Sequence, residues 1–317
     1  MISDGDDDLR GSVVSGNDVS VIIATRGRPI LLRRAIRSIL AQTTSVQLEV
    51  VVVFDQVEID PLEEIAQSSA RKIVTVSNTG APGLAGARNT GVRAASHGYI
   101  AFCDDDDEWL PEKIDRQLEL ALSDPGAVIV ATGIRIVSSG GVHNRRSPAR
   151  ADLQDLLGSR ITELHPSSFV MRRTHLLGDL GLVDETIPAS YGEDYDLLLR
   201  AAKVGHISAI PDPLTIVHWD RTSFFNERWR GVAEGLTYLL SKHPEFASSP
   251  RGRARIEGQI AFAHAALGER SAARSWVRKA LRNDRTQLRA YLAGLISVHV
   301  LPAGLVVNLL NRRGRGL

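Results

Sequence analysis

Cysteine is almost absent from this sequence of 317 residues, in which Cys103 stands alone. A disulfide framework and a cysteine-based zinc cluster are therefore excluded. A strong charge of one sign is absent too, because 38 Lys and Arg stand against 37 Asp and Glu, a net charge of +1. This balance gives no protein-wide basic field, so we expect no nucleic-acid partner. A hydrophobic content of 43% excludes a chain that is disordered throughout.

The chain ends lack clear membrane or export signals. Residues 1–17 are acidic, rich in Gly and Ser and without an apolar core, so we expect a disordered tail and no signal peptide. Residues 290–311 lack Asp, Glu, Lys and Arg but contain Pro302. Three interpretations stay open for them: a spanning helix, an interfacial helix, or a helix packed on its own domain. We expect a cytoplasmic protein, either soluble or peripheral at the inner face of the membrane.

Charge is divided unevenly along the chain. Residues 251–317 hold 13 Lys and Arg against 3 Asp and Glu, whereas residues 1–250 carry a net charge of −9. We expect residues 226–317 to form a basic helical region, in which residues 261–280 resemble a tetratricopeptide-type hairpin. Its charge either serves an anionic membrane surface or a phosphate-bearing lipid-linked acceptor, or is a solvated face.

Strands and helices alternate in the first part of the chain, which predicts βαβ units and a parallel sheet. The predicted strands are 19–25, 48–54, 72–76 and 99–103. The predicted helices are one from Pro29, one at 61–69 and one ending near 95. After residue 120 the alternation stops, and strands at 127–137, 167–171 and 213–217, with a polar loop at 138–149, predict a second, mixed half.

Two glycine motifs are missing. The first strand is followed by Thr25-Arg26-Gly27-Arg28-Pro29 and not by G-x-G-x-x-G, which excludes a dinucleotide-binding fold. No G-x-x-x-x-G-K-[ST] occurs, which disfavours a P-loop ATPase. An open parallel sheet binds its ligand beyond the carboxyl ends of its strands. Thr25, Asp55 and the run Asp104–Asp107 follow three of these strands, so we expect them to form one site.

Four adjacent carboxylates repel one another and need a compensating cation. In an extended segment residues i and i+2 face the same way, so we expect Asp104 and Asp106 to point together and Asp105 and Asp107 to point oppositely. A divalent ion would neutralise one such pair. The alternative is a solvated acidic loop in which Asp107 caps a helix starting at Pro111.

Several segments resemble the family 2 glycosyltransferases. The resemblance covers about residues 18–222 and rests on 21–29 (VIIATRGRP), 38–43 (SILAQT), 49–55 (EVVVVFD), 83–95 (GLAGARNTGVRAA), 98–114 (GYIAFCDDDDEWLPEKI) and 192–200 (GEDYDLLLR). It implies an α/β GT-A fold, a Rossmann-like and mostly parallel sheet with flanking helices. It also implies a nucleotide-diphosphate sugar donor, a divalent metal (Mg²⁺ or Mn²⁺), and transfer with inversion.

The resemblance assigns roles on the donor side. It implies that Thr25 and Arg28 lie beside the donor nucleotide and that Asp55 receives the base N–H, although Phe54-Asp55-Gln56 replaces the family's two acids followed by Gly-Ser. Arg88 matches the Ala-Arg-Asn element at the start of a helix.

The aspartate run covers the family's D-x-D motif. The resemblance implies that Asp106 binds the metal and that Asp104 and Asp105 reach the ribose or a metal-bound water. His218 matches a position that often supplies an additional metal ligand; a core or surface histidine is the alternative.

On the acceptor side, inverting transfer needs a general base that deprotonates the acceptor hydroxyl. The resemblance implies that Asp194 is this base and that Glu193 orients the acceptor. The alternative is that either carboxylate only caps the following helix. Asp220, Arg221 and Ser223 follow the last predicted strand and are candidates for a diphosphate-binding loop.

We therefore predict a donor-binding half at 18–120, an acceptor-binding half at 121–225 and the helical region from 226. The predicted activity is metal-dependent inverting hexosyl transfer from a nucleotide-diphosphate sugar, UDP-sugar favoured, to a saccharide or lipid-linked acceptor. A sugar-nucleotide-forming nucleotidyltransferase is one alternative, but it would carry a Gly-rich basic loop where Arg26-Gly27-Arg28 stands. A non-catalytic sugar-nucleotide binder is the other, and the intact D-x-D motif and Asp194 argue against it.

Overall fold

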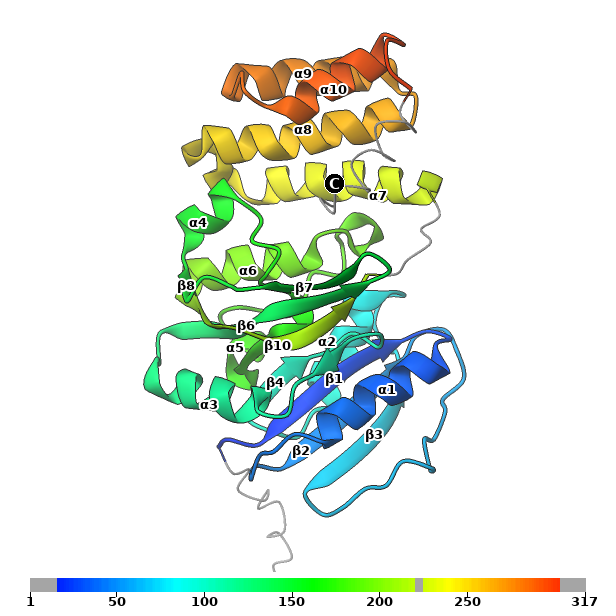
Figure 1. The fold of residues 1–317 in the computed structure, drawn as a ribbon, viewed down its shortest axis with the longest axis vertical. Coiled ribbons are helices and arrows are strands. Elements are labelled where there is room, and N and C mark those ends of the chain that lie inside the picture. Colours follow the sequence, from blue (N-terminus) through cyan, green and yellow to red (C-terminus); the bar gives the residue numbers. More distant parts are fainter. Residues whose placement is uncertain (1–15, 220–224, 303–317) are drawn as a thin grey trace, which may run out of the picture.

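The computed structural model describes residues 16–219 and 225–302. Within them a single ten-stranded sheet carries helices on its faces, and four further helices are stacked at one end of the molecule (Figure 1). The sheet order is β3-β2-β1-β4-β9-β6-β10-β5, with β7 beside β6 and β8 beside β10. This mixed but mostly parallel α/β sheet with a C-terminal helical region confirms the predicted fold class.

The first half of the sheet is parallel throughout. Its strands are β1 (Val19–Thr25), β2 (Leu48–Phe54), β3 (Arg71–Ser77) and β4 (Tyr99–Phe102). Apolar and β-branched residues dominate β1 and β2 because both faces of these strands are covered. The helices of this half are α1 (Pro29–Leu40), with proline in its first turn, and α2 (Leu84–Ala94).

The second half joins the first through β9 (Val170–Arg172), which pairs antiparallel with β4 and with β6 (Ala127–Ser138). β10 (His206–His218) then runs parallel to β6. The remaining elements are β5 (Glu108–Trp109), α3 (Lys113–Ser123), β7 (Gly141–Arg145), β8 (Arg150–Ala151), α4 (Leu153–Gly158), α5 (Arg173–Leu177) and α6 (Glu193–Val204). One continuous sheet thus underlies both predicted halves.

The C-terminal helices lie in layers on the side of α6 away from the sheet (Figure 1). They are α7 (Phe225–Lys242), α8 (Pro250–Ala266), α9 (Arg270–Asn283) and α10 (Leu288–Ser297). α8 and α9 form a hairpin whose turn contains Gly268 with a φ of 78°. Asp196 of α6 anchors α7, because its Oδ1 lies 2.8 Å from both Lys242 Nζ and His243 Nε2.

The uncharged stretch begins in α10, where Ala290, Ala293 and Ile296 are buried. This part of it therefore packs on its own domain, as one of the three interpretations proposed. Across the described ranges, no helix combines the length and the apolar character that crossing a bilayer requires. Residues 303–311 of the uncharged stretch and the residues 312–317 that follow it lie outside the described part of the chain.

Three local predictions were wrong. Residues 61–69 form turns and no helix, because the Asp60 carboxylate accepts the Leu62 N–H (3.1 Å) and Leu62 adopts a φ of 56°. The polar loop at 138–149 contains β7, which closes a hairpin on β6. Residues 167 and 168 of the strand predicted at 167–171 belong to a 3₁₀ turn that opens at Pro166, so the strand starts only at Val170.

Lys113, the first residue of α3, is a buried lysine. Lys113 is fully buried, its Nζ lies 3.7 Å from the centroid of the Trp109 ring, and Nζ has no hydrogen-bond partner among the described residues. Burial lowers the pKa of Lys113 from 10.5 to about 7. The folded protein therefore binds fewer protons at this group than the unfolded chain between these two values.

We expect the wild type to gain stability relative to K113M as pH rises from about 7 towards 10.5. The gain approaches about 1.4 kcal/mol per pH unit, since the unfolded chain binds the extra proton there. Below pH 7 both states are protonated, so the two curves should run parallel. Urea titrations of both proteins at several pH values measure this, and a constant difference across the range would contradict it.

Candidate active site

Polar groups from the ends of β1 and β4 meet as predicted. Thr25 Oγ1 donates to Asp105 (2.8 Å), and Arg28 Nη1 donates to Asp105 (3.0 Å) and to Asp106 (3.1 Å). Asp105 is buried, and this burial raises the pKa of its carboxyl against the opposing effects of Thr25 and Arg28. Thr25, Arg28 and the aspartate run therefore form one hydrogen-bonded unit.

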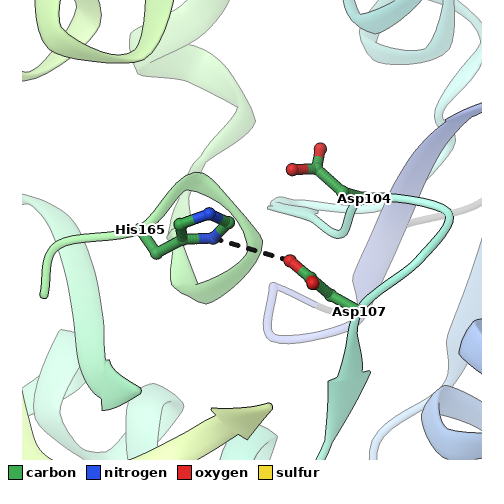
Figure 2. Close-up of side chains that lie close together, drawn as sticks. All are labelled: Asp104, Asp107 and His165. Atoms are coloured by element: carbon green, nitrogen blue, oxygen red, sulfur yellow. Dashed lines mark ion pairs between the residues drawn. The ribbon is translucent and has the colours of Figure 1, made fainter. Parts of the chain in front are cut away.

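The aspartate run is a turn and not an extended segment. The Asp107 N–H donates to the Asp104 carbonyl oxygen at 3.2 Å, so residues i and i+3 approach each other. The expected alternation of side chains was wrong for this reason. Asp105 and Asp106 share Arg28, whereas Asp104 and Asp107 both face His165 (Figure 2).

Among the residues that the structure describes, Asp104, Asp107 and His165 form a group of side chains that could hold a metal ion. One ligand atom from each lies within 4.8 Å of the others, and His165 Nδ1 is 3.6 Å from Asp107 Oδ2 (Figure 2). Burial and then the charge of Asp104 raise the pKa of Asp107. Burial lowers the pKa of His165, which keeps the imidazole neutral and able to coordinate. Two carboxylates and a neutral imidazole suit Mn²⁺ better than Mg²⁺.

Asp107 is not the helix cap that the alternative interpretation required. Its carboxylate accepts from Ser167 Oγ (2.6 Å) and from the His218 N–H (3.3 Å), and the N-cap residue of α3 is Glu112.

The predicted metal ligands Asp106 and His218 lie at the border of this group. Asp106 is paired with Arg28, and His218 Nε2 lies 2.8 Å from Glu108 Oε1. Their role as ligands stays a prediction.

Arg88 connects the two halves of the site. It is 3% exposed, and its guanidinium binds Asp104 Oδ1 (2.7 Å) and Glu193 Oε1 (2.8 Å). Burial alone would lower the pKa of Arg88, but the charges of Asp104 and Glu193 outweigh it and the net pKa is raised. Arg88 is therefore not a solvated charge on the surface of α2. Arg88 joins the end of β4 to the first turn of α6.

Glu193 and Asp194 open α6 directly after Gly192, which has a φ of 90°. The N-cap residue is Gly192, so neither carboxylate stands at the N-cap position of α6. Asp194 is held by Arg160, whose Nη2 lies 2.9 and 2.7 Å from the two carboxylate oxygens.

The two neighbouring carboxyls differ in their electrostatics. Burial and the charge of Asp194 raise the pKa of Glu193, with Arg88 opposing this shift. Burial pushes the pKa of Asp194 upward as well, but the charge and hydrogen bonds of Arg160 outweigh it and the net pKa is lowered. Asp194 is therefore ionised at neutral pH, and its side chain, 12% exposed against 7% for Glu193, is the more accessible of the two.

Asp55 directly follows β2, and its carboxylate already accepts hydrogen bonds within the protein. Its carboxylate accepts from Asn78 Nδ2 (2.8 Å) and from the Gly83 N–H (3.1 Å), and so fixes the loop before α2. The predicted contact with the donor base is a further role for it and stays a prediction.

Sequence reasoning missed Arg160 and His165. Both lie in the irregular segment between α4 and β9, and neither belongs to a motif, so one sequence carries no signal for them. Asp107 was expected at the site as part of the aspartate run, but the resemblance assigned it no role as a metal ligand. Asp220, Arg221 and Ser223, the candidates for a diphosphate loop, lie outside the described residues.

Comparison with known proteins assigns the class. Residues 20–177 match the family described as Glycosyl transferase family 2. The chain carries this domain and belongs to the family 2 glycosyltransferases.

Curated relatives agree with this class. The chain is 29% identical over 192 residues to Escherichia coli WfgD, a UDP-Glc:alpha-D-GlcNAc-diphosphoundecaprenol beta-1,3-glucosyltransferase, covering 61% of this chain and 72% of the relative. It is 30% identical over 208 residues to the succinoglycan biosynthesis protein ExoO of Rhizobium meliloti, covering 61% of this chain and 58% of the relative. The matched region thus spans under two thirds of ExoO.

Solved structures match over nearly the whole chain. Crystal structures of S. aureus TarS 1–349 share the fold with a TM-score of 0.59 at 18% identity, covering 94% of this chain and 92% of TarS. The TarS complex with UDP-GlcNAc gives a TM-score of 0.61 at 16% identity, with the same coverage. The fold common to both includes the C-terminal helices.

We expect R88M to lower the free energy of unfolding by about 3–5 kcal/mol at pH 7, because it leaves the buried Glu193 and the partly buried Asp104 without their cation. The matched control is R116Q, which removes a half-exposed pair with Asp212 and should cost at most about 1 kcal/mol. Adding E193Q to R88M should recover part of the loss. Urea denaturation measures all three, and equal costs for R88M and R116Q would contradict the bridging role.

Proposed function

We propose that the protein transfers a sugar from a UDP-sugar to an acceptor hydroxyl with inversion, in the synthesis of a polysaccharide, glycolipid or glycoconjugate. The observation that carries this proposal is the chain of contacts Asp104–Arg88–Glu193, which joins the D-x-D turn to the start of α6 and places the ionised Asp194 next to it. The names of WfgD and of the TarS complexes support UDP as the nucleotide of the donor.

In this proposal the donor lies at the carboxyl ends of β1 and β4, beside Thr25, Arg28 and the D-x-D turn. Asp105 is fixed by Thr25 and Arg28 and therefore offers a rigid acceptor for the donor's hydroxyl groups. Arg28, whose side chain is 45% exposed, supplies positive charge next to the diphosphate.

Asp194 is the proposed general base. Its carboxylate takes the proton of the acceptor hydroxyl while that oxygen forms a bond to the anomeric carbon. The bond from this carbon to the diphosphate oxygen breaks, and the nucleoside diphosphate leaves with the electron pair. Arg160 keeps Asp194 ionised before the reaction and fixes its orientation. Glu193, held by Arg88, is placed to orient the acceptor.

A divalent cation fits the aspartate run, and Asp104, Asp107 and His165 are the residues proposed to hold it. When bound, the cation offsets the negative charge of the donor's diphosphate. Burial raises the pKa of Asp107, and the charge of Asp104 adds to this effect, so a cation bound between the two would offset their repulsion. Asp106 and His218 form the alternative ligand set.

Two other functions are distinguished by one assay. A nucleotidyltransferase would exchange pyrophosphate with a sugar nucleotide, and a non-catalytic binder would bind UDP-sugar without releasing UDP. Incubation with radiolabelled UDP-sugars and candidate acceptors separates transfer from both. The absence of a basic Gly-rich loop after β1 favours transfer over nucleotidyl transfer.

We expect D194N to reduce transfer by about 10²–10⁴-fold, because it removes the proton acceptor while keeping the size of the side chain. The affinity for UDP should stay nearly unchanged, since a base acts in the transition state. E193Q should have a smaller effect on kcat and a larger one on the KM of the acceptor. Steady-state kinetics beside a thermal melt measure this. Wild-type turnover in folded D194N would make Glu193 the candidate base.

We expect Mn²⁺ to raise the thermal unfolding midpoint of the protein. When Mn²⁺ is at 100 times its Kd, the free energy of unfolding should increase by about 2.7 kcal/mol. D107N and H165A should lose this shift, whereas H175A, which alters a histidine of α5 outside the site, should keep it. Calorimetry without donor or acceptor measures the effect. If D106N and H218A lose the shift while D107N and H165A keep it, the alternative ligand set holds the ion.

A further inference from the structure

Two arginines of the C-terminal helices lie close to the candidate base. Arg255 comes from α8 and Arg289 from α10. Arg255 Nη2 donates to the hydroxyl of Tyr195 at 3.1 Å. The Tyr195 ring, one residue after Asp194, has the Arg255 Cζ and the Arg160 Cζ each 5.9 Å from its centroid. A guanidinium from the C-terminal region and the guanidinium that holds the base thus share one aromatic ring.

Arg160 differs from Arg255 and Arg289 in whether a carboxylate neutralises its charge. Arg160 is neutralised by Asp194. Across residues 16–219 and 225–302, no carboxylate forms an ion pair with Arg255 or Arg289, and the Arg255 Nε is buried without a hydrogen-bond partner. Glu257, the acid nearest to Arg255 on α8, is bonded to Arg253 (3.0 Å) and Asn283 (2.8 Å).

Arg255 and Arg289 also lie close to each other. A side chain added at Gly258, three residues after Arg255, would meet Arg289 Cβ at 3.5 Å, so α10 packs on α8 at this level. Burial and then the charge of Arg255 lower the pKa of Arg289, and burial is also the main cause of the lowered pKa of Arg255. Two partly buried like charges without carboxylates are costly, and a bound anion would remove this cost.

We propose that Arg255 and Arg289 bind a phosphate or diphosphate group carried by the acceptor. A guanidinium fork matches the geometry of phosphate oxygens, and two forks suit the charge of a diphosphate. The group belongs to the acceptor because both arginines come from the helices stacked beyond α6, and Arg255, with Arg289 near it, bonds to Tyr195 next to the base. The donor's own anion is provided for by Arg28 and the D-x-D turn.

This inference rests on the proposed function, since it takes Asp194 as the point where the acceptor hydroxyl reacts. It gives the basic C-terminal region a defined task, the selection of an anionic acceptor. The name of WfgD, which contains a diphospho-lipid acceptor, is consistent with this chemistry in a relative.

The test compares two acceptors that differ in the diphosphate group. One is an N-acetylglucosaminyl diphosphate with a short alkyl chain, and the other is the neutral alkyl N-acetylglucosaminide without the diphosphate. UDP-glucose is the donor, and UDP release gives kcat and KM. The variants are R255Q and R289Q, with R255K as the conservative form. R278Q is the matched control, because Arg278 is an exposed arginine of the same basic region.

We expect R255Q and R289Q to raise the KM of the diphosphate acceptor by about 10- to 100-fold, as the loss of a charge-assisted hydrogen bond predicts. Their kcat, their KM for UDP-glucose and their KM for the neutral acceptor should stay within about twofold of the wild type. R255K should recover part of the loss, and R278Q should behave as the wild type. Inorganic pyrophosphate should compete with the diphosphate acceptor in the wild type and less in both Gln variants.

Equal changes of KM for the charged and the neutral acceptor would overturn the inference, and so would a loss confined to UDP-glucose affinity. Should R255Q fail to fold, R289Q alone decides. The Arg289 side chain makes no hydrogen bond within the described chain, so we expect R289Q to fold. If the wild type releases no UDP with either acceptor, the proposed function fails. Calorimetric binding of the diphosphate probe to protein saturated with UDP, compared between wild type and R289Q, then still tests the arginine site.

Discussion

The buried guanidinium of Arg88 is the interaction on which the site depends. Arg88 reaches from α2 to Asp104 at the end of β4 and to Glu193 at the start of α6, and it stacks on Phe102 with Cζ 5.2 Å from the ring centroid. The buried Glu193 and the partly buried Asp104 come from distant segments of the chain, and this one cation lies between them. The distance between the D-x-D turn and the base is therefore set by one side chain.

Glu193 and Asp194, neighbours at the start of α6, have pKa values shifted in opposite directions because each is paired with a different arginine. Glu193 faces Arg88, which already serves Asp104, so burial prevails and the pKa of Glu193 is raised. Asp194 has Arg160 to itself, so its pKa is lowered and its charge persists. A pair of adjacent carboxyls with separated pKa values is the arrangement that lets one act on protons while the other orients a substrate.

The C-terminal helices are part of the same unit and not an appendage. Asp196, also on α6, is held by Lys242 at the end of α7 and by His243 directly after it, while Arg255 of α8 bonds to Tyr195. One short helix thus carries the proposed base, the anchor for α7 and the aromatic ring that contacts α8. Changes in the packing of these helices would reach the acceptor side of the site directly, through α6.

The sequence by itself determined the parallel strands, the family, and the meeting of Thr25 with the aspartate run, because buried β-branched runs specify strands and parallel strands end at one edge. It could not give the turn at Asp104–Asp107, which depends on one backbone hydrogen bond, nor the partners Arg160 and His165, which approach from a segment without regular pattern. Asp194 was found by its motif, but its ionised state was decided by Arg160, 34 residues away in the chain. Charge balance in a buried site is a property of contacts between distant segments, and only the tertiary structure brings those segments together.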